Sequence, residues 1–148
     1  MVCTANQCRS PMAEYLLRRL LGPNSKWKVI SAGTSAIPGV RASMSAIEVM
    51  AGLGVDISAH RSRGVTEEMI DSATIVITMT NSQRDEIVSC FPRARDKVFT
   101  LMSIAGDAGG GDVADPVGMS AADYRRTRDE IDGMMPDVVL FLHEQGGD

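Results

Sequence analysis

Short apolar runs alternate with segments of helical periodicity along the sequence, and this alternation limits the possible folds more than any other feature. The runs at 27–33, 73–79 and 97–101 are expected to form strands. Parallel strands joined by crossover helices are covered on both faces, which suits such continuous apolar runs. The sequence therefore predicts an α/β fold with a parallel sheet. No linker, repeat or low-complexity tract divides it, so we expect one domain over residues 1–148.

The first helix is expected directly after Ser10, which is typical of an N-cap, with Pro11 at the first helical position. Its apolar stripe ends at Gly22 and Pro23, a common stop signal. Further helices are indicated by the apolar stripe at 46–53, after Thr66, from Thr80 or Asn81 to about Phe91, and from about Ser120 towards Gln145. Pro136 has no N–H donor, so it predicts a kink or a restart in the last helix.

The composition argues against several classes of partner. A net charge of −4 and the lack of a basic run argue against nucleic-acid binding, and Arg93, Arg95 and Lys97 are interpreted as solvated surface. No apolar run is long enough to span a membrane, and no signal peptide is recognised. Three cysteines without repeated spacing favour a reducing compartment, so the expected location is the cytoplasm. Of these, Cys90 is expected to be a small buried residue.

The segment CTANQCRS, residues 3–10, lies between the opening strand and the first helix. Ligands of doubly wound sheets bind at the carboxyl ends of the strands, which is where this segment falls. Such a loop and the following helix N-terminus offer several backbone N–H groups to one tetrahedral anion such as phosphate. We therefore interpret as a phosphate cradle the backbone of Thr4, Ala5, Asn6, Gln7 and Cys8.

Several side chains of this segment give it chemistry. Cys3 begins the loop, so its sulfur can lie under the bound anion, where the N–H donors and the helix dipole stabilise a thiolate. Arg9 presents a planar fork that binds two oxygens at once. Ser10 is a candidate donor to the thiolate, and Asn6 tolerates the left-handed backbone that a tight loop needs. A lone cysteine is typically structural, but Cys-x5-Arg-Ser at this junction favours nucleophilic catalysis.

Cleavage of a phosphate ester by a thiolate needs a general acid that protonates the leaving group. Asp115 is the candidate, because it ends the long loop at 103–117 and Pro116 stiffens the turn after it. Asp-Pro alone is also typical of a plain turn, and Asp107 and Asp112 are rivals on composition.

Several stretches resemble the low-molecular-weight protein tyrosine phosphatases in order and spacing: VCTANQCRSPMAE at 2–14, SAGT at 31–34, AHRSRGVTEE at 59–68 and Asp-Pro at 115–116. RDKVFTL at 95–101 and DPVGMSAADYRRTRDEI at 115–131 look closest to the bacterial protein arginine phosphatase branch. The resemblance covers almost the whole chain. It implies a three-layer α/β/α fold with a four-stranded parallel sheet, and hydrolysis of a phosphomonoester or phosphoramidate without a metal ion or other cofactor.

The resemblance also implies roles for matching positions. Cys3 would be the nucleophile, Arg9 the clamp of the transition state and Asp115 the general acid, with Ser10 activating the thiolate. The expected partner is a phosphorylated protein carrying phosphotyrosine or phosphoarginine, and the expected product is inorganic phosphate. No nucleic-acid or membrane partner is expected, and the expected state is a monomer.

Other positions match the network that braces the loop in this family, namely Asn6, Ser31 and His60. Cys8 matches the family's second loop cysteine. It is a candidate partner of Cys3 in a reversible disulfide, which would protect the nucleophile from irreversible oxidation.

The chain also departs from the family's pattern. Ala5 stands where glycine is usual, which bears on the curvature of the loop. Gln7 replaces the isoleucine of tyrosine phosphatases or the threonine that helps arginine phosphatases to select phosphoarginine, so the substrate stays open between the two. Val117 replaces the usual aromatic residue after Asp-Pro, which weakens the case for stacking a phosphotyrosine ring. Only Met1 and Val2 precede the nucleophile, so we expect a shortened first strand and either missing upstream residues or a mis-assigned start.

Other functions fit part of the pattern. An arsenate reductase shares the fold but relays oxidation through two further cysteines on a mobile segment, and beyond the loop only Cys90 is present. A non-catalytic module would hold a phosphorylated partner in the same loop, but it would need neither Cys3 nor Asp115. A dinucleotide-binding domain is disfavoured because no G-x-G-x-x-G follows the first strand.

Overall fold

The sheet of the computed structural model contains four parallel strands in the order β2-β1-β3-β4. The structure describes residues 1–106 and 111–146. The strands are Val2–Cys3 (β1), Ala32–Gly33 (β2), Val76–Thr78 (β3) and Val98–Thr100 (β4). Val2 pairs with Ala32 on one side and with Thr78 on the other, so the strand that carries Cys3 lies inside the sheet. The predicted four-stranded parallel sheet is confirmed.

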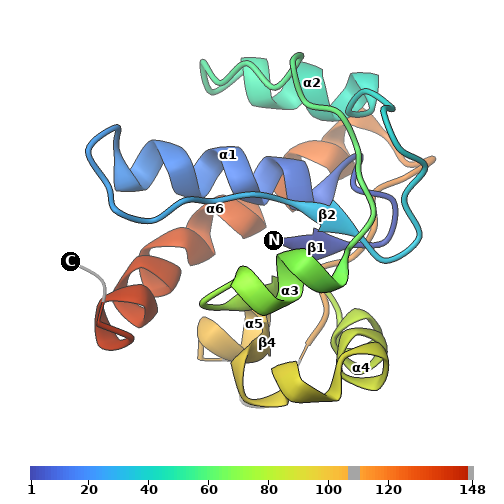
Figure 1. Cartoon of the computed structure of the whole chain (residues 1–148). Helices are drawn as coiled ribbons and strands as arrows, with labels where there is room; N and C mark the ends of the chain where they lie inside the picture. Colours follow the sequence, from blue (N-terminus) through green and yellow to red (C-terminus); the bar gives the residue numbers. More distant parts are fainter. Residues whose placement is uncertain (107–110, 147–148) are drawn as a thin grey trace.

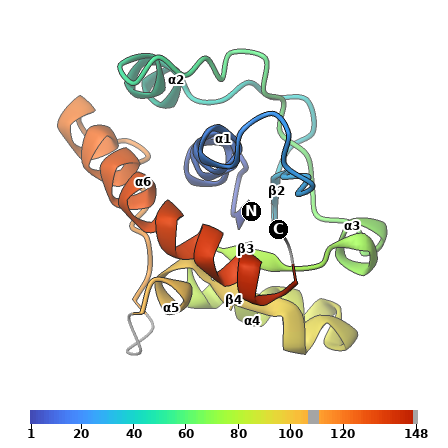
Figure 2. The ribbon, with the colours of Figure 1, turned by 90° about the vertical axis from the view of Figure 1, so that its left-hand side faces the viewer.

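Helices cover both faces of this sheet (Figure 1 and Figure 2). On one face lie α1 (Arg9–Leu21), α2 (Met44–Ala51) and α6 (Ala121–Glu144), with α1 packed along α6. On the other face lie α3 (Glu67–Ser72) and α4 (Asn81–Cys90). A 3₁₀-helix, η1 (Pro92–Lys97), leads into β4, and the short α5 (Leu101–Ile104) follows that strand directly. The expected three-layer arrangement is therefore found.

Two apolar clusters fill the spaces between these layers. The larger lies between the sheet and helices α1, α2 and α6, and it includes Leu16 and Ile131. The smaller lies against α3 and α4 and includes Ile70. Val76 and Ile77 are neighbours in β3 and belong to opposite clusters, as alternate positions of a strand do. Burial on both faces explains why the strands read as continuous apolar runs.

Side-chain caps begin the later helices where the sequence places them. Thr66 caps α3 by accepting from the N–H of Met69. Thr80 and Ser120 each form a capping box, at the start of α4 and of α6. These three helix starts are confirmed.

The expected start of the first helix is wrong. α1 begins at Arg9, so Ser10 and Pro11 lie inside its first turn. The reason is that the Ser10 hydroxyl is bonded to the side chains of Cys3 and Asn6 and does not cap a backbone N–H. Pro11 is tolerated because the N–H groups of the first turn have no partner within the helix.

Three other expectations also differ from the structure. The strands are only two or three residues long, so the apolar runs at 27–33, 73–79 and 97–101 form strand structure over only part of their length. Of the kink or restart expected at Pro136, the restart is not found, because α6 runs from Ala121 to Glu144 with Pro136 inside it. Cys90 is exposed, because it ends α4 beyond the turns that bury Gln83 and Ile87.

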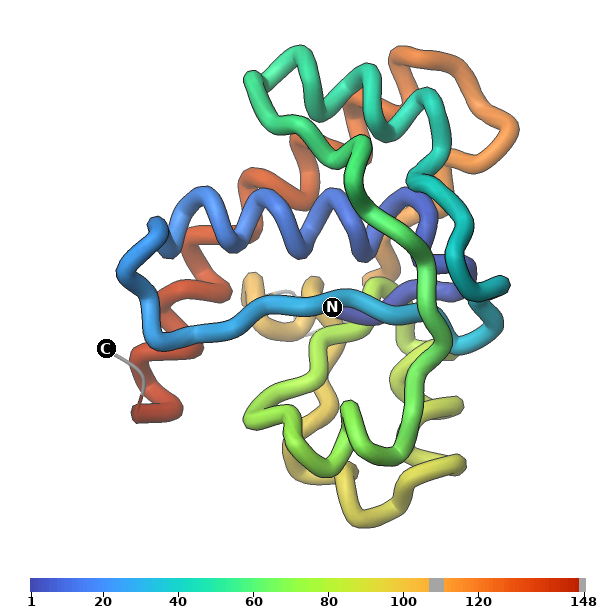
Figure 3. The backbone as a smooth tube through the Cα atoms, turned by 45° about the horizontal axis from the view of Figure 1, so that its top comes forward, coloured from blue at the N-terminus to red at the C-terminus, as the bar shows by residue number. Residues whose placement is uncertain are grey.

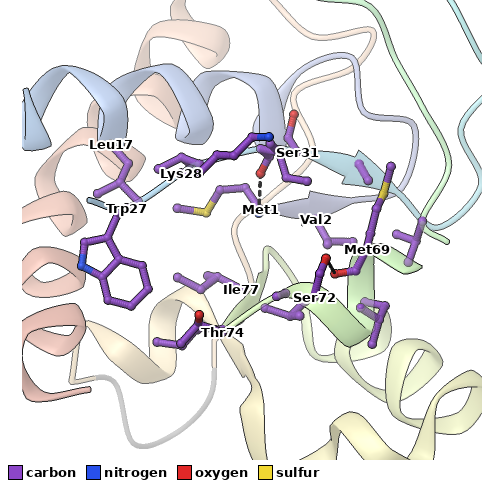
Figure 4. Close-up of a pocket in the computed structure, with 18 of the residues that line it drawn as sticks. Met1, Val2, Leu17, Trp27, Lys28, Ser31, Met69, Ser72, Thr74 and Ile77 are labelled. Atoms are coloured by element: carbon purple, nitrogen blue, oxygen red, sulfur yellow. Dashed lines mark hydrogen bonds between the residues drawn. The ribbon is translucent and has the colours of Figure 1, made fainter. Parts of the chain in front are cut away.

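A cavity of about 500 Å³ lies in front of β1, at the end of the sheet opposite the loop 3–10 (Figure 4). Its walls come from the segments that precede β2 and β3, and Figure 4 shows Trp27 and Ile77 on two sides of it. Figure 3 shows the chain after α1 running back along that helix to reach β2. The first strand is therefore short, as expected. The chain segments that lead into β2 and β3 extend beyond the point where β1 begins.

The amino group of Met1 lies at the inner end of this cavity and donates to the Ile30 carbonyl oxygen at 3.0 Å. Burial lowers the pKa of this amino group to about 6, although the nearby Glu14 carboxylate partly opposes the effect. An amine that is neutral when folded and charged when unfolded makes the unfolded state bind more protons. Stability therefore rises with pH between about 6 and 8.

We expect about four apolar residues appended before Met1 to raise the free energy of unfolding, because they would continue β1 into the cavity and fill a strand of ordinary length. The gain should be larger at pH 6 than at pH 8, by about 2 kcal/mol, because the extension removes the charged amine from the sheet. Urea unfolding at both pH values separates the gain that comes from apolar burial from the gain that depends on pH. A Gly-Ser extension of equal length should keep the pH-dependent part alone, and equal stability of all three chains would contradict the prediction.

Candidate active site

The segment 3–10 forms a tight loop between β1 and α1, at the carboxyl end of the sheet. Asn6 turns the chain with a left-handed backbone (φ 58°), and within 1–106 and 111–146 it is the one non-glycine residue of positive φ. The left-handed backbone that the sequence analysis expected at Asn6 is therefore found. Ala5 has no positive φ, so the curvature of the loop does not require the family's glycine there.

The end of β2 supports this loop from outside. The N–H of Thr34 donates to the Cys3 carbonyl oxygen, and that of Ser35 to the Thr4 carbonyl oxygen, both at 2.9 Å. Gly33 lies so close to the loop that a Cβ at this position would overlap the Thr4 carbonyl oxygen. A residue without a side chain is therefore needed at this point of the 31–34 motif.

The Cys3 sulfur faces the Ser10 hydroxyl oxygen at 2.9 Å, and both groups are buried. Nδ2 of Asn6 donates to Ser10 Oγ at 2.8 Å and to Ser31 Oγ at 2.9 Å. Ser31 in turn donates to a carboxylate oxygen of Glu14 at 2.6 Å. These side chains form one continuous chain of hydrogen bonds that ends at the sulfur.

Asn6 makes two further bonds, both with the segment 60–63. Its Oδ1 accepts from the backbone N–H of Arg63 at 3.1 Å, and its carbonyl oxygen lies 2.8 Å from Nε2 of His60. Nε of Arg63 also donates to the Ser31 carbonyl oxygen at 3.1 Å. The structure thus brings Asn6, Ser31 and His60 together. Arg63 was missed, because its backbone N–H, which any residue but proline would supply, makes the bond to Asn6.

Arg9 joins the loop to the segment that carries Asp115. Its Nη1 donates to the Val113 carbonyl oxygen at 2.8 Å, and its Nη2 lies 3.6 Å from Oδ2 of Asp115. Val113 is anchored in turn, because its N–H donates to the Met79 carbonyl oxygen at 2.9 Å. The Arg9 guanidinium is buried, whereas the Asp115 side chain is 49% exposed. The candidate clamp Arg9 and the candidate acid Asp115 are therefore adjacent, and the Asp115 carboxyl is open to exchange of protons with water.

The two rival carboxylates do not replace Asp115 in the structure. Asp112 accepts from the backbone N–H of Asn81 at 2.8 Å, at the start of α4. Asp107 lies outside the described residues. Asp115 also accepts from the N–H of Val117 at 3.1 Å, which holds the turn formed by Asp-Pro. Among the described carboxylates of this loop, Asp115 is the one that contacts Arg9.

Cys8 is buried between two hydroxyl groups that the sequence analysis did not single out. Its sulfur lies 3.9 Å from the hydroxyl oxygens of Tyr124 and Ser43. Burial raises the pKa of the Cys8 thiol, and its hydrogen bonds with these hydroxyls oppose the rise. The N–H of Ser43 donates to the Gln7 carbonyl oxygen at 2.9 Å, which fixes the loop on this side. Cys8 is therefore a protonated, weakly reactive thiol near neutral pH.

Gln83 is a further residue of the site that the sequence analysis missed. It is buried in the first turn of α4, where its Oε1 accepts from the N–H groups of Met79 and Thr80, each at 3.0 Å. Its Nε2 donates to the Thr4 hydroxyl oxygen at 3.1 Å. Gln83 thus ties α4 to the residue that follows Cys3. The spacing Thr80-x-x-Gln83 is typical of a capping box and predicts the bonds of Gln83 at the start of α4, but it does not indicate the contact with Thr4.

The described parts of the chain contain neither a cluster of metal ligands nor a membrane-spanning helix. Within residues 1–106 and 111–146, no group of three or more His, Cys, Asp or Glu side chains is arranged to hold a metal ion. Among the helices of those same two ranges, none is long and apolar enough to cross a bilayer.

A thiol with a hydrogen-bond donor beside it, at the base of a loop that opens a helix, suits attack on a phosphoryl group. A buried guanidinium next to it suits the charge of the transferred group, and a half-exposed carboxyl suits protonation of the leaving atom. Fold and site together define a cysteine-dependent protein phosphatase.

Comparison with known proteins gives the same class. The profile of the family described as low molecular weight phosphotyrosine protein phosphatase matches residues 1–146, so the chain belongs to that family and is a hydrolase. A protein-arginine-phosphatase of Geobacillus stearothermophilus is 43% identical over 134 residues, which cover 90% of this chain and 88% of that protein. A more distant relative is arsenate reductase 2 of Staphylococcus haemolyticus, which is 32% identical over 130 residues. The match covers 88% of this chain and 86% of the reductase.

A solved structure shows the same similarity. It is a mutant of the YwlE arginine phosphatase with a phosphorylated active-site serine, and it superposes with a TM-score of 0.91. Its sequence is 38% identical, and the match covers 96% of this chain and 93% of that one. The similarity therefore extends through the sheet and both layers of helices.

We expect Cys8→Ser to make inactivation by peroxide harder to reverse. In the unmodified chain, a sulfenic acid on Cys3 can condense with the Cys8 thiol and release water, which leaves a disulfide that reductants open. A serine forms no such bond, so Cys3 would be oxidised further. The measurement is phosphatase activity recovered with a thiol reductant after peroxide treatment. Cys90→Ser, which removes the exposed thiol, is the matched control, and equal recovery of all three proteins would disprove a protective role.

Proposed function

We propose that Cys3 removes phosphoryl groups from phosphorylated protein side chains through a phosphocysteine intermediate. The 2.9 Å contact between the Cys3 sulfur and the Ser10 hydroxyl carries the proposal, because a buried thiolate without a donor would be costly. In the first step the sulfur attacks phosphorus, and the bond from phosphorus to the leaving oxygen or nitrogen breaks. In the second step water attacks phosphorus, the sulfur leaves, and inorganic phosphate is released.

Arg9 is proposed as the clamp on the phosphoryl oxygens, together with the N–H groups of the loop from Thr4 to Cys8. Its contacts with Val113 and Asp115 support this role, because they orient the guanidinium before a ligand arrives and so limit reorganisation. Asp115 is proposed to protonate the leaving atom in the first step and to take a proton from water in the second. Its half-exposed carboxyl supports this role, because both steps need exchange with solvent.

A covalent intermediate is also supported by the similar arginine phosphatase mutant, whose active-site serine is phosphorylated. A phosphoryl group on the side chain at that position is what a double displacement requires. Serine retains the group because its alkoxide is a poorer leaving group than a thiolate. The proposed second step of this chain therefore depends on sulfur at position 3.

The proposed substrate class is phosphoarginine in preference to phosphotyrosine. Val117 follows the Asp-Pro turn and is 60% exposed, so it offers an aliphatic surface where a ring would be needed for stacking. The relative from Geobacillus stearothermophilus, named as a protein-arginine-phosphatase, supports the same choice. Gln7 is half-buried in the loop, where it is the position most suited to contact the group that carries the phosphate.

We propose that the enzyme works as a monomeric domain over residues 1–148, in the cytoplasm and without a cofactor. Its cysteines support a reducing compartment, because Cys3, Cys8 and Cys90 are all free thiols. A net charge of −4 supports a protein substrate and not a nucleic acid. The product of the proposed reaction is inorganic phosphate.

Arsenate reduction is the competing function on this fold, and the relative from Staphylococcus haemolyticus gives it a specific basis. A reductase of this kind relays oxidation through two further cysteines on a mobile segment, and beyond the loop 3–10 this chain has only Cys90. Of the two cysteines other than Cys3, Cys8 is buried, and Cys90 is exposed at the end of α4. Phosphoryl transfer needs neither, so the cysteines favour the phosphatase.

We expect Cys3→Ser to abolish turnover of p-nitrophenyl phosphate, and Asp115→Asn to lower kcat on phosphopeptides by about a hundredfold, since the leaving atom then lacks its acid. The loss should be smaller on p-nitrophenyl phosphate, because nitrophenolate leaves more easily unprotonated. Steady-state rates measure both effects. Asp112→Asn is the matched control, because Asp112 faces the start of α4, and its rate should stay within about twofold. Full activity of Asp115→Asn would reject this acid.

A side-by-side rate measurement on phosphoarginine and phosphotyrosine peptides of one sequence tests the substrate. We expect the higher kcat/KM with phosphoarginine, and we expect Gln7→Thr to increase that preference. Gln7→Ile should shift the ratio towards phosphotyrosine, because an apolar side chain suits a ring better than a guanidino group. A higher value for phosphotyrosine in the unmodified chain would overturn the proposed preference, while the phosphatase chemistry would stand.

A further inference from the structure

Glu14 is a buried carboxylate that the proposed reaction does not use directly. It lies on α1 and is only 5% exposed. One oxygen accepts from the Ser31 hydroxyl at 2.6 Å, and the other pairs with Nη1 of Arg18 at 2.8 Å. An apolar side chain at this position of α1 would avoid the cost of burying a charge. The carboxylate therefore calls for a role beyond packing.

A series of hydrogen bonds links Glu14 to Cys3 through Ser31, Asn6 and Ser10. The carboxylate decides which group donates at its own end of the series. A carboxylate only accepts, so the Ser31 proton points to Glu14, and Ser31 Oγ must accept from its other partner. That partner is Nδ2 of Asn6, which donates its second proton to Ser10 Oγ. Ser10 then has its own proton left to donate, and the remaining partner is the Cys3 sulfur at 2.9 Å.

The amide of Asn6 cannot turn over to reverse this order. Its Oδ1 accepts from the backbone N–H of Arg63, which can only donate. Nδ2 must therefore face the two serine hydroxyls. The Arg63 N–H alone decides which way the amide faces. What Glu14 adds is a Ser31 oxygen whose proton points away, so that it can accept from Nδ2 and hold the amide in place beside Ser10.

We propose that Glu14 is a positioning residue, which acts through Ser31 and Asn6 to hold the Ser10 proton on the Cys3 thiolate. This inference deepens the proposed function and rests on it, since the thiolate matters because it attacks phosphorus. A negative charge on Glu14 has no direct benefit for a second negative charge on Cys3. Its effect is the orientation of the donors between them.

Every charged or titratable group around Cys3 bears on the test. These groups come from β1, the loop, α1 and the segments 60–63 and 113–115, and they are the Met1 amine, Cys8, Arg9, Glu14, His60, Arg63 and Asp115. Substitution of Glu14 alone leaves all the others in place. It removes a negative charge, which by Coulomb's law would favour the thiolate, and it removes the orientation of Ser10, which would disfavour it. The two effects have opposite signs.

Glu14→Met tests the proposal, because it keeps the length and apolar packing of the side chain but removes the acceptor. We expect the thiolate titration midpoint of Cys3 to move up by about one pH unit and kcat to fall about tenfold, the value of one hydrogen bond to a charged group, with KM nearly unchanged. Glu14→Gln should restore most of both, because an amide oxygen still accepts from Ser31. A residue that only packs would give the reverse order, with Met as good as Glu.

Three further proteins complete the design. Ser31→Ala should act like Glu14→Met, and the double variant should lose no more than either, because the two residues act in one chain. Arg18→Met breaks the same ion pair but leaves the Ser31 bond, so it should stay within about twofold of the unmodified chain. Thermal unfolding of each protein excludes a loss of fold.

The thiolate is measured by its ultraviolet absorbance, as the difference between each protein and the same protein carrying Cys3→Ser. This readout needs no turnover, so it separates the two proposals. If the unmodified chain hydrolyses no phosphopeptide but the midpoint still moves up in Glu14→Met, the proposed function fails and the positioning role stands. A midpoint that stays or moves down in Glu14→Met overturns the positioning role, whatever the phosphatase activity.

Discussion

The site depends on Asn6, a fully buried residue with a left-handed backbone. Its side chain and its carbonyl oxygen together make four hydrogen bonds. These bonds reach Ser10 on α1, Ser31 before β2, and His60 and Arg63 on the segment beyond α2. A left-handed backbone is costly for a residue other than glycine, but an asparagine tolerates it best and here gains partners in every direction. The position of the loop that carries Cys3 is therefore set by three segments that meet on a single side chain.

The parallel sheet explains why these segments can meet. All four strands run in one direction, so the loops that follow β1, β2 and β3 leave the sheet at the same edge. β1 is short, yet Val2 pairs on both sides and Cys3 pairs with Gly33 of β2, which is enough to place Cys3 at that edge. At the opposite end of the strand the Met1 amine is buried, which lowers its pKa to about 6. The loop 3–10 and this buried amine thus lie at opposite ends of one strand.

The sequence was sufficient where a residue's own properties decide its place. Alternating apolar runs predict the α/β layers, and the left-handed tolerance of Asn6 predicts the turn of the loop. It was insufficient where tertiary partners decide. Ser10 looks like a helix cap, but its hydroxyl is taken by Cys3 and Asn6. Gln83 looks like a surface residue of α4, yet it reaches the loop. Such roles depend on which segments meet, and spacing along the chain does not encode that.

Burial divides the site into two parts with different tolerance of change. Cys3, Ser10 and Asn6 are buried and mutually bonded, so a substitution in any of them leaves an unsatisfied polar group in the interior. Gln7 is half-buried and Val117 is exposed, so a new side chain at either position meets water at least in part. In the proposed reaction, bond cleavage is thus tied to the folding of the whole chain, while the proposed choice of phosphorylated residue rests on positions that can vary separately. This division explains how one loop and one sheet can serve phosphatases of different substrates.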